Sequence, residues 1–120
     1  MSGIIYVAGP YSAGNVIDVL KNIGRGQQVC ANLFNSGFNP FCPWHDHHFI
    51  TDNPDCDADV ERFYEYSIEF LKVSDAMFLV EGWEKSKGTL EEIKVAKLHG
   101  IPVFDEIDDL LEWAGLKGDK

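Results

Sequence analysis

The sequence predicts an α/β protein in which helices cover both faces of a parallel sheet. Short apolar runs alternate with longer amphipathic segments along the chain, as expected when strands and crossover helices follow one another. The run at 76–80, Ala-Met-Phe-Leu-Val, is apolar at every position, which is typical of a central parallel strand. We therefore expect a three-layer, Rossmann-like (flavodoxin-like) sandwich with four to five parallel strands and right-handed crossovers.

Length and charge narrow the class of protein. A chain of 120 residues is expected to form a single domain, residues 1–120, whose core needs neither disulfide nor metal. The net charge of −10 argues against a nucleic-acid polymer as partner, because such binding depends on Lys and Arg contacts to phosphates. No apolar run is long enough to cross a bilayer, and no basic segment precedes the first one. We expect a cytoplasmic protein with free thiols and no membrane partner.

The first half of the chain predicts two strands around a long helix. Residues 4–8 are β-branched and aromatic, and Gly9 and Pro10 end the run. Asn15 is the expected N-cap of a helix that reaches about residue 34, and residues 38–42 form the next short strand. The apolar residues that recur on one face of that helix are Ile17, Leu20, Gly24, Ala31 and Phe34.

The segment 43–59 is the least regular part of the chain. It holds three of the four histidines, and a loop of this length is usually functional or mobile. Its apolar residues indicate that it folds over something, so we expect a lid or pocket wall. Its side chains include types that zinc binds, but their spacing fits no standard finger, and we expect no metal. The residues concerned are Cys42, His45, His47, His48 and Cys56.

The second half predicts three helices and two strands. A helix reaches about residue 73, with an apolar stripe of Phe63, Tyr66, Phe70 and Val73. The strand at 76–80 leads to a helix from residue 89 to about 99, whose expected buried side is Ile93, Ala96 and either Val95 or Leu98. A strand at 101–104 and a helix at 107–114 follow, and the helix is expected to pack Leu110, Leu111 and Trp113.

Two carboxylates, Glu91 and Glu92, follow Gly88 where the 89–99 helix begins. Open α/β sheets bind ligands beyond the carboxyl ends of their strands, which is where this helix begins. The helix dipole favours negative charge there, so a carboxylate is expected to stay ionised, as a nucleophile must be. Ser86 and Gly88 offer a hydroxyl and backbone N–H groups to a phosphate. Acidic residues in first turns are also common without any catalytic role, so the pattern alone leaves both interpretations open.

Aromatic and glycine residues at the ends of strands suggest a pocket. Tyr6, Tyr11, Trp44 and Trp83 are placed to stack on a base, although packing in the core or on the surface explains each one equally well. Gly9 allows close approach of a ligand, or simply forms a turn. Neither a G-x-G-x-x-G sequence nor a Walker sequence is present, and we expect no cofactor.

Three segments in order resemble the nucleoside 2-deoxyribosyltransferase superfamily, which includes the deoxynucleoside 5′-monophosphate N-glycosidases. They are IYVAGP at 5–10, SDAMFLVEGW at 74–83 and SKGTLEEIKVAKLHGIPV at 86–103. The resemblance spans about residues 4–104. It implies cleavage of the N-glycosidic bond of a nucleoside or nucleoside 5′-monophosphate, by hydrolysis or deoxyribosyl transfer, in a homodimer or higher homo-oligomer.

The resemblance also implies roles for single residues. Glu92, four residues before Ala96, matches the nucleophile that forms the covalent intermediate. Ser86 matches the serine that contacts the 5′-phosphate, and Gly88 matches the glycine of that loop.

At the other strand ends, Tyr6 matches a tyrosine lining the site and Gly9 the turn beside the sugar. His45 follows the second strand and is the candidate general acid. Ser67 stands where the family often has an aspartate that helps protonate the leaving base.

Two further departures are Lys94, where the family usually has glycine, and Ser12, near the place of an arginine. The substitution at position 67 motivates an alternative, a nucleotide-binding module of the same fold without catalysis. A metal-binding interaction protein that uses the 42–56 segment is a third hypothesis.

Overall fold

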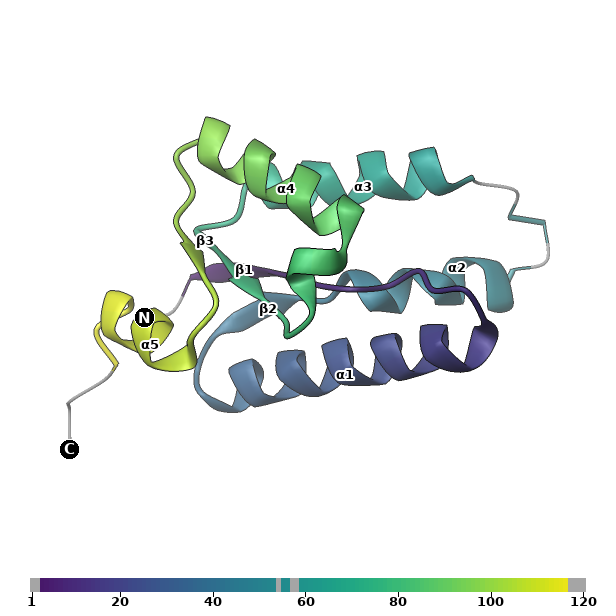
Figure 1. Ribbon diagram of the computed structural model, residues 1–120. Helices are drawn as coiled ribbons and strands as arrows, with labels where there is room; N and C mark the ends of the chain where they lie inside the picture. Colours follow the sequence, from purple (N-terminus) through teal and green to yellow (C-terminus); the bar gives the residue numbers. More distant parts are fainter. Residues whose placement is uncertain (1–2, 54, 57–58, 117–120) are drawn as a thin grey trace.

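The computed structural model describes residues 3–53, 55–56 and 59–116, and the described chain forms one parallel sheet between two helical layers (Figure 1). These residues contain four strands: β1 (Ile4–Ala8), β2 (Asn39–Phe41), β3 (Ala76–Leu79) and β4 (Val103–Phe104). They pair in the order β2-β1-β3-β4, and every pair is parallel. The prediction of a three-layer, Rossmann-like α/β fold is confirmed.

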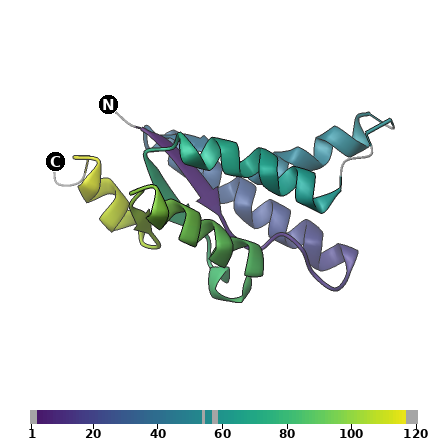
Figure 2. The same cartoon turned by 90° about the horizontal axis from the view of Figure 1, so that it is seen from above.

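The two helical layers lie on opposite faces of the sheet. Helices α1 (Val16–Asn35) and α5 (Ile107–Trp113) cover one face, and α3 (Val60–Lys72) and α4 (Lys87–Leu98) cover the other. Figure 2 shows the same arrangement from above, with α3 and α4 crossing over the strands. Three short helical segments complete the chain: η1 (Pro43–His47), α2 (His48–Thr51) and η2 (Trp83–Lys85).

The central strands alternate between the two layers. Ile5 and Val7 of β1 face α1, whereas Tyr6 faces α3 and α4, and all three side chains are fully buried. Tyr6 is in register with Met77 of β3 and with Phe41 of the edge strand β2. Because successive side chains of a strand point to opposite faces, this register fixes which residues meet in each layer. Within the described residues, no helix combines the length and apolarity needed to cross a membrane.

Helix α1 presents the opposite face to the one expected. The predicted stripe is real but lies in solvent, with Ile17, Leu20 and Phe34 exposed by 65%, 60% and 68%. The buried residues of α1 are Ile23, Gly26, Cys30 and Leu33. A Cβ at residue 26 would overlap the indole of Trp44, so the absence of a side chain at Gly26 leaves room for that ring. The core-facing surface of α1 is therefore built from smaller residues than the solvent-facing one.

The other helices match the expected stripes in part. In α3 the buried residues are Ser67, Ile68 and Leu71, while the predicted Phe70 and Val73 are largely exposed. In α4 Ala96 is buried and Val95 is half-buried, which resolves the choice against Leu98. The segment 43–59 is more regular than expected, because η1 and α2 occupy its first half.

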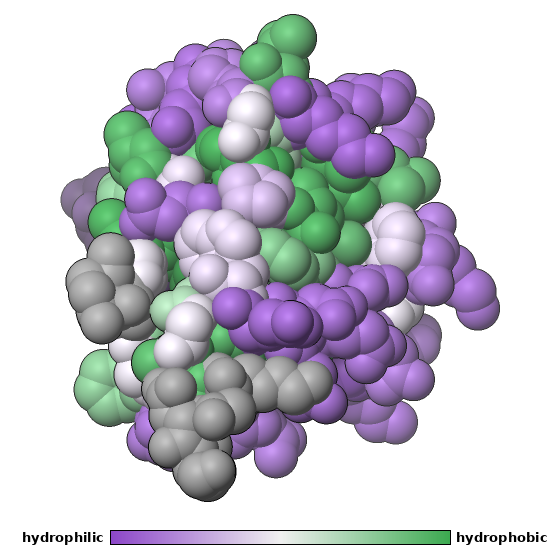
Figure 3. All heavy atoms as spheres, turned by 90° about the vertical axis from the view of Figure 1, so that its left-hand side faces the viewer, coloured by the Kyte–Doolittle hydropathy of each residue, from purple (hydrophilic) through white to green (hydrophobic). Residues whose placement is uncertain are grey.

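Exposed apolar residues are not confined to α1. Figure 3 views the end of the molecule that lies at the left of Figure 1, and hydrophobic residues there reach the surface among hydrophilic ones. Leu98, the last residue of α4, and Val73, which follows α3, are exposed by 83% and 67%. Isolated exposed apolar side chains are ordinary in folded proteins, whereas a continuous stripe calls for an explanation.

Candidate functional site

The candidate site lies where the carboxyl ends of β1 and β3 meet. From β1 the chain crosses to β2 at the edge of the sheet, then returns over β1 to β3, so these two strands flank the point where the strand order reverses. Open α/β folds bind their ligands at such a point. The two loops that leave these strands touch, because a Cβ on Gly82 would lie 3.2 Å from the ring of Pro10. Gly82 has φ of +92°, a conformation that glycine adopts without strain.

A tyrosine and a glutamate join the sheet to α4 at this place. The hydroxyl of Tyr6, on β1, donates a hydrogen bond of 2.5 Å to Oε2 of Glu92, on α4. The ring of Tyr6 is buried and stacks on Phe41 of β2, with 5.5 Å between centroids and 21° between planes. Stacking on Phe41 orients the ring of Tyr6, and the hydroxyl group of the same side chain then fixes the position of the Glu92 carboxylate.

Burial raises the pKa of Glu92 to about 7, and the hydrogen bond from Tyr6 opposes that rise. The expectation that the helix dipole keeps this carboxylate ionised is wrong. Helix α4 begins at Lys87, two residues earlier than predicted, so Glu92 is its sixth residue and lies in the second turn. The influence of the dipole falls off within the first turn, and desolvation dominates here. Near neutral pH, Glu92 exchanges between its two protonation states.

Two side chains of α3 complete the surroundings of this pair. Ser67 is buried, and its hydrogen bond with Tyr6 favours the ionised phenol and partly offsets the other effects on the tyrosine. Burial, and next the charge of Glu92, raise the pKa of Tyr6 well above its usual range. Tyr64 lies one turn away, where burial first and then the charges of Glu92 and Glu91 raise its pKa. A serine at position 67 therefore contacts the tyrosine that holds the candidate nucleophile.

The start of α4 is capped by Ser86. Its hydroxyl oxygen accepts hydrogen bonds from the backbone N–H of Thr89 at 3.2 Å and from Oγ1 of Thr89 at 2.8 Å. Gly88 lies in the first turn with open space around it, since a Cβ there would meet no atom within 4 Å. No packing constraint in the described structure requires a glycine at 88. An anion at this helix start would meet the N–H groups that precede Thr89, whose own N–H is bonded to Ser86.

The two remaining predicted binding residues have clear neighbours. A Cβ on Gly9 would lie 2.7 Å from Cβ of Val80, so the glycine lets the loop after β1 pack against the end of β3. This close approach to Val80 is a structural reason for Gly9 that the sequence did not reveal. Trp83 is half-buried in η2 and packs against the core layer that contains Tyr6.

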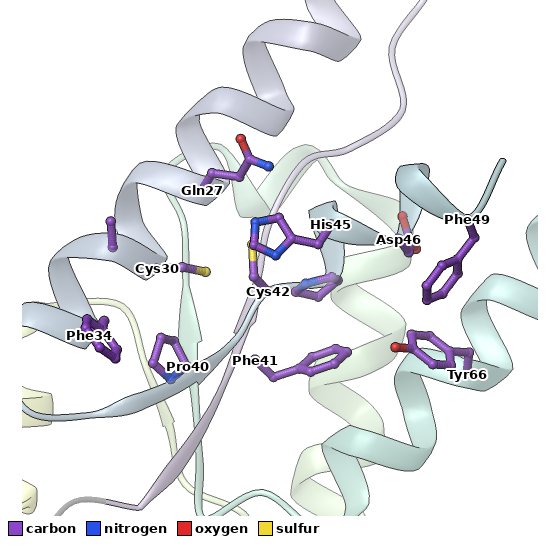
Figure 4. A pocket seen from close by; sticks show the side chains of 12 residues that line it. Gln27, Cys30, Phe34, Pro40, Phe41, Cys42, His45, Asp46, Phe49 and Tyr66 are labelled. Atoms are coloured by element: carbon purple, nitrogen blue, oxygen red, sulfur yellow. The ribbon is translucent and has the colours of Figure 1, made fainter. Parts of the chain in front are cut away.

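His45 lies apart from this group of residues. It follows β2 in η1, is exposed, and lines a pocket of about 580 Å³ (Figure 4). Segment η1 packs on α1, and Glu92 does not line this pocket. Phe41, which stacks on Tyr6, is among the lining residues. The structure thus brings Tyr6, Ser67 and Glu92 together, with Ser86 and Gly88 at the start of the same helix, but it does not place His45 beside them.

Sequence reasoning missed two pairs on the α1 side of the sheet. Tyr11 donates a hydrogen bond of 2.7 Å to the buried carboxylate of Asp46, whose pKa is raised by burial. Cys30 and Cys42 form a hydrogen-bonded pair of thiols that lines the pocket. Neither pair leaves a periodic signal, because each joins a loop to an element distant in sequence. Among the described residues, no group of three or more His, Cys, Asp or Glu side chains is placed to hold a metal.

Fold and site together define the class: a parallel α/β protein with a phenol–carboxylate pair beside the point where the strand order reverses. A family model described as a domain of unknown function, DUF7768, matches residues 3–105, so the chain belongs to that family. The match ends just before α5. No curated protein matches the chain.

Proposed function

We propose that the chain cleaves the N-glycosidic bond of a nucleoside or nucleoside 5′-monophosphate through a covalent intermediate on Glu92, as the resemblance to the deoxyribosyltransferase superfamily implies. The observation that carries the proposal is the bond between Tyr6 and Glu92 at the reversal point of the sheet. A half-buried carboxylate with a pKa near 7 and a fixed orientation is unusual outside functional sites.

In the proposed reaction, the ionised carboxylate of Glu92 attacks the anomeric carbon of the sugar. The carbon–nitrogen bond breaks through an oxocarbenium-like transition state, and the base leaves as it gains a proton. Water or a second base then attacks the same carbon and releases Glu92. The phenol of Tyr6 stabilises the carboxylate both before the attack and as it leaves, because in both cases negative charge is on the oxygen that it binds.

A 5′-phosphate fits the start of α4. The first-turn N–H groups and the cap residue Ser86 lie beside the open space at Gly88, on the helix that carries Glu92. Helix starts of this kind bind phosphate through backbone N–H groups and the dipole. A monophosphate substrate would therefore favour hydrolysis over transfer, in line with the N-glycosidase branch of the superfamily.

The proton for the leaving base has two candidate sources. His45 follows the carboxyl end of β2, at the same end of the sheet as Glu92, but on the pocket that faces α1. Ser67 contacts Tyr6 directly, yet a hydroxyl is a weak general acid. A His45→Gln variant separates them, since loss of the acid slows the release of bases that are poor leaving groups more than that of good ones.

The direct test is chromatography of a panel of deoxynucleosides and their 5′-monophosphates after incubation with the protein. We expect release of free base by the wild type and none by Glu92→Ala. Glu91→Ala is the matched control, because its carboxylate is exposed and pairs with Lys94 on the helix surface, at 3.3 Å. Activity that survives in Glu92→Ala, or no release from any substrate, would exclude the proposal.

A second candidate function is binding of a nucleotide without chemistry, and Ser67 favours it because the family often has an aspartate there. The two candidates differ in a simple measurement. Thermal stabilisation by a nucleotide that is never cleaved supports the binding module, whereas cleavage excludes it. The three free thiols favour a reducing compartment, so we place either function in the cytoplasm.

The homo-oligomer implied by the resemblance has a candidate interface in the exposed stripe of α1. Its positions, 17, 20, 24, 27, 31 and 34, follow the alternating three- and four-residue spacing of a coiled-coil seam. An antiparallel pair of α1 helices would set Leu20 against Ala31, Ile17 against Phe34 and Gly24 against Gln27, so that large residues meet small ones at two of the three layers.

Charge supports a second copy as the occupant of this surface. Helix α1 carries one acidic and two basic residues, Asp18, Lys21 and Arg25, in a chain of net charge −10. Two copies that meet elsewhere would bring their excess negative charge together, and α1 avoids that repulsion. We expect wild type to run as a dimer in light scattering and Leu20→Glu as a folded monomer. A wild type that stays monomeric at all concentrations would exclude this interface.

A further inference from the structure

Two thiols line a pocket at the β2 edge of the sheet, between α1 on one side and Phe49 of α2 and Tyr66 of α3 on the other. Cys30 comes from the buried face of α1, and Cys42 follows β2 and precedes η1. Figure 4 shows the sulfur of Cys30 directed toward Cys42, and the two thiols share a hydrogen bond. They are twelve residues apart in sequence but meet because α1 leads back to β2.

The two sulfurs are not equivalent. Cys42 accepts the thiol hydrogen of Cys30, and this bond is the largest of the effects that lower its pKa. The backbone N–H groups of Trp44 and His45 add to the effect, while burial opposes it. The same bond, together with burial, raises the pKa of Cys30. The direction of these pKa shifts and the greater exposure of Cys42 both favour Cys42 as the attacking thiol and Cys30 as its partner.

Cys42 is also the more solvent-accessible of the two thiols. Cys30 is 6% exposed, whereas Cys42 is half-buried, and both line the pocket of about 580 Å³. The surrounding wall includes the apolar side chains of Phe34, Phe41 and Phe49. A small uncharged oxidant enters such a pocket more readily than a large or charged reagent, and it meets Cys42 first.

We propose that Cys30 and Cys42 form a reactive dithiol that hydrogen peroxide, or a small organic hydroperoxide, converts into a reversible disulfide. The sulfur of Cys42, as thiolate, attacks the terminal peroxide oxygen; the S–O bond forms and the O–O bond breaks. The released hydroxide takes a proton to become water, or, with an organic hydroperoxide, the released alkoxide takes a proton to become an alcohol. Cys30 loses its proton and attacks the sulfenic acid; the S–S bond forms and a second water leaves. The thiols lose two electrons, and the peroxide gains them.

The disulfide would join α1 to the end of β2. The sulfurs must approach from hydrogen-bond contact to about 2.05 Å, which draws the helix toward η1 and narrows the pocket between them. This inference does not depend on the proposed glycosidase activity, because the dithiol lies on the opposite face of the sheet from Glu92.

The test is mass spectrometry of the intact, folded protein after treatment with hydrogen peroxide, followed by digestion without reductant. We expect a mass loss of two hydrogens, a linked peptide containing Cys30 and Cys42, and full reversal by dithiothreitol. Cys56→Ser is the matched control and keeps the link, because Cys56 lines a different pocket. Iodoacetamide should modify Cys42 faster than Cys30, because the pKa of Cys42 is lowered and its side chain is the more exposed of the two.

Single substitutions give the order of the two steps. In Cys30→Ser, the sulfenic acid at Cys42 has no partner and is captured by dimedone; in Cys42→Ser, neither a link nor an adduct forms. Circular dichroism verifies that both variants remain folded. A wild type that forms no link under peroxide, or whose links involve Cys56 as often as Cys30, would overturn the proposal.

Discussion

Two tyrosine–carboxylate pairs lie on opposite faces of this sheet, and their chemistry is nearly the same. Tyr6 donates to Glu92 at 2.5 Å, and Tyr11 donates to Asp46 at 2.7 Å. Burial raises the pKa of both carboxylates, and the tyrosine hydrogen bond opposes the rise in both. A buried phenol–carboxylate pair therefore does not by itself identify a catalytic site.

The Tyr6–Glu92 and Tyr11–Asp46 pairs differ in their surroundings. Asp46 lies in η1 beside Trp44, whose indole N–H donates to the carbonyl of Pro10 at 3.0 Å. The hydrogen bonds Tyr11–Asp46 and Trp44–Pro10 together hold the loop after β1 against η1, so the role of this pair is structural. Glu92 joins a strand to a helix at the reversal point of the sheet, near the open first turn of α4. Both pairs lie beyond the carboxyl ends of strands, but only Glu92 is carried by the helix that follows β3, beside the point where the strand order reverses.

The largest expected contrast is in catalysis. Glu92→Gln removes the nucleophile without a change of volume and should lower kcat/KM by at least about a thousandfold. Asp46→Asn should leave kcat/KM within about threefold of the wild type, because the change is confined to the fastening of a loop. Base release measured by chromatography tests both. Equal losses in the two variants would refute the distinction between the pairs.

A second prediction concerns the free energy of unfolding and tests the packing around the Tyr11–Asp46 pair. Gly26→Ala places a Cβ inside the ring of Trp44 and should disturb the Asp46 side alone, lowering the free energy of unfolding by about 2–3 kcal/mol. Gly24→Ala is the matched control on the same helix. Its Cβ meets no atom within 4 Å, so it should stabilise the protein by roughly 0.5–1 kcal/mol. Urea unfolding measures both values, and destabilisation by Gly24→Ala would contradict the assigned packing.

These contrasts also explain what the sequence could and could not predict. The alternation of short apolar runs with longer amphipathic segments predicted the parallel sheet, because parallel strands need crossover connections between them. The face of α1 was not predictable in the same way. Its exposed stripe is apolar like its buried one, and the buried face includes Gly26, against which the indole of Trp44 packs from η1. Periodicity reports which residues share a face but not what covers that face.

The candidate site likewise has features that could be predicted from the sequence and features that depend on tertiary packing. The resemblance implied that Tyr6 and Glu92 share one site, and the hydrogen bond between them joins β1 to α4. The protonation of Glu92 did not follow, because it depends on the turn of α4 in which the residue lies and on how much solvent the neighbouring helices exclude. Asp46 was missed because a side chain in an irregular segment finds its partner through tertiary packing alone.

A third prediction concerns how stability varies with pH. The pKa of Glu92 is raised in the folded state, to about 7 from the usual 4.5, so the folded state binds the proton more tightly. Stability from this group is complete below about pH 4.5 and is lost as the pH rises through 7. Glu92→Gln keeps a neutral side chain and should be more stable than wild type at pH 8, on the order of 2 kcal/mol, with little difference at pH 4.5. Glu91→Gln, at an exposed position, is the control and should change stability little at either pH.

The smallest expected effect tests the hydrogen bond itself. The bond from Tyr6 lowers the pKa of Glu92, so Tyr6→Phe should raise that pKa above 7 by up to about one unit. Carbon-detected NMR of the Glu92 carboxyl group measures the titration directly and needs no turnover. If the proposed function holds, the acidic limb of kcat/KM moves to higher pH by the same amount, because attack requires the ionised form. Tyr11→Phe should leave both titrations of Glu92 unchanged, since that phenol bonds to Asp46 on the other face. An unchanged or lowered pKa in Tyr6→Phe would show that burial alone sets the protonation of Glu92, and the phenol would then only position the carboxylate.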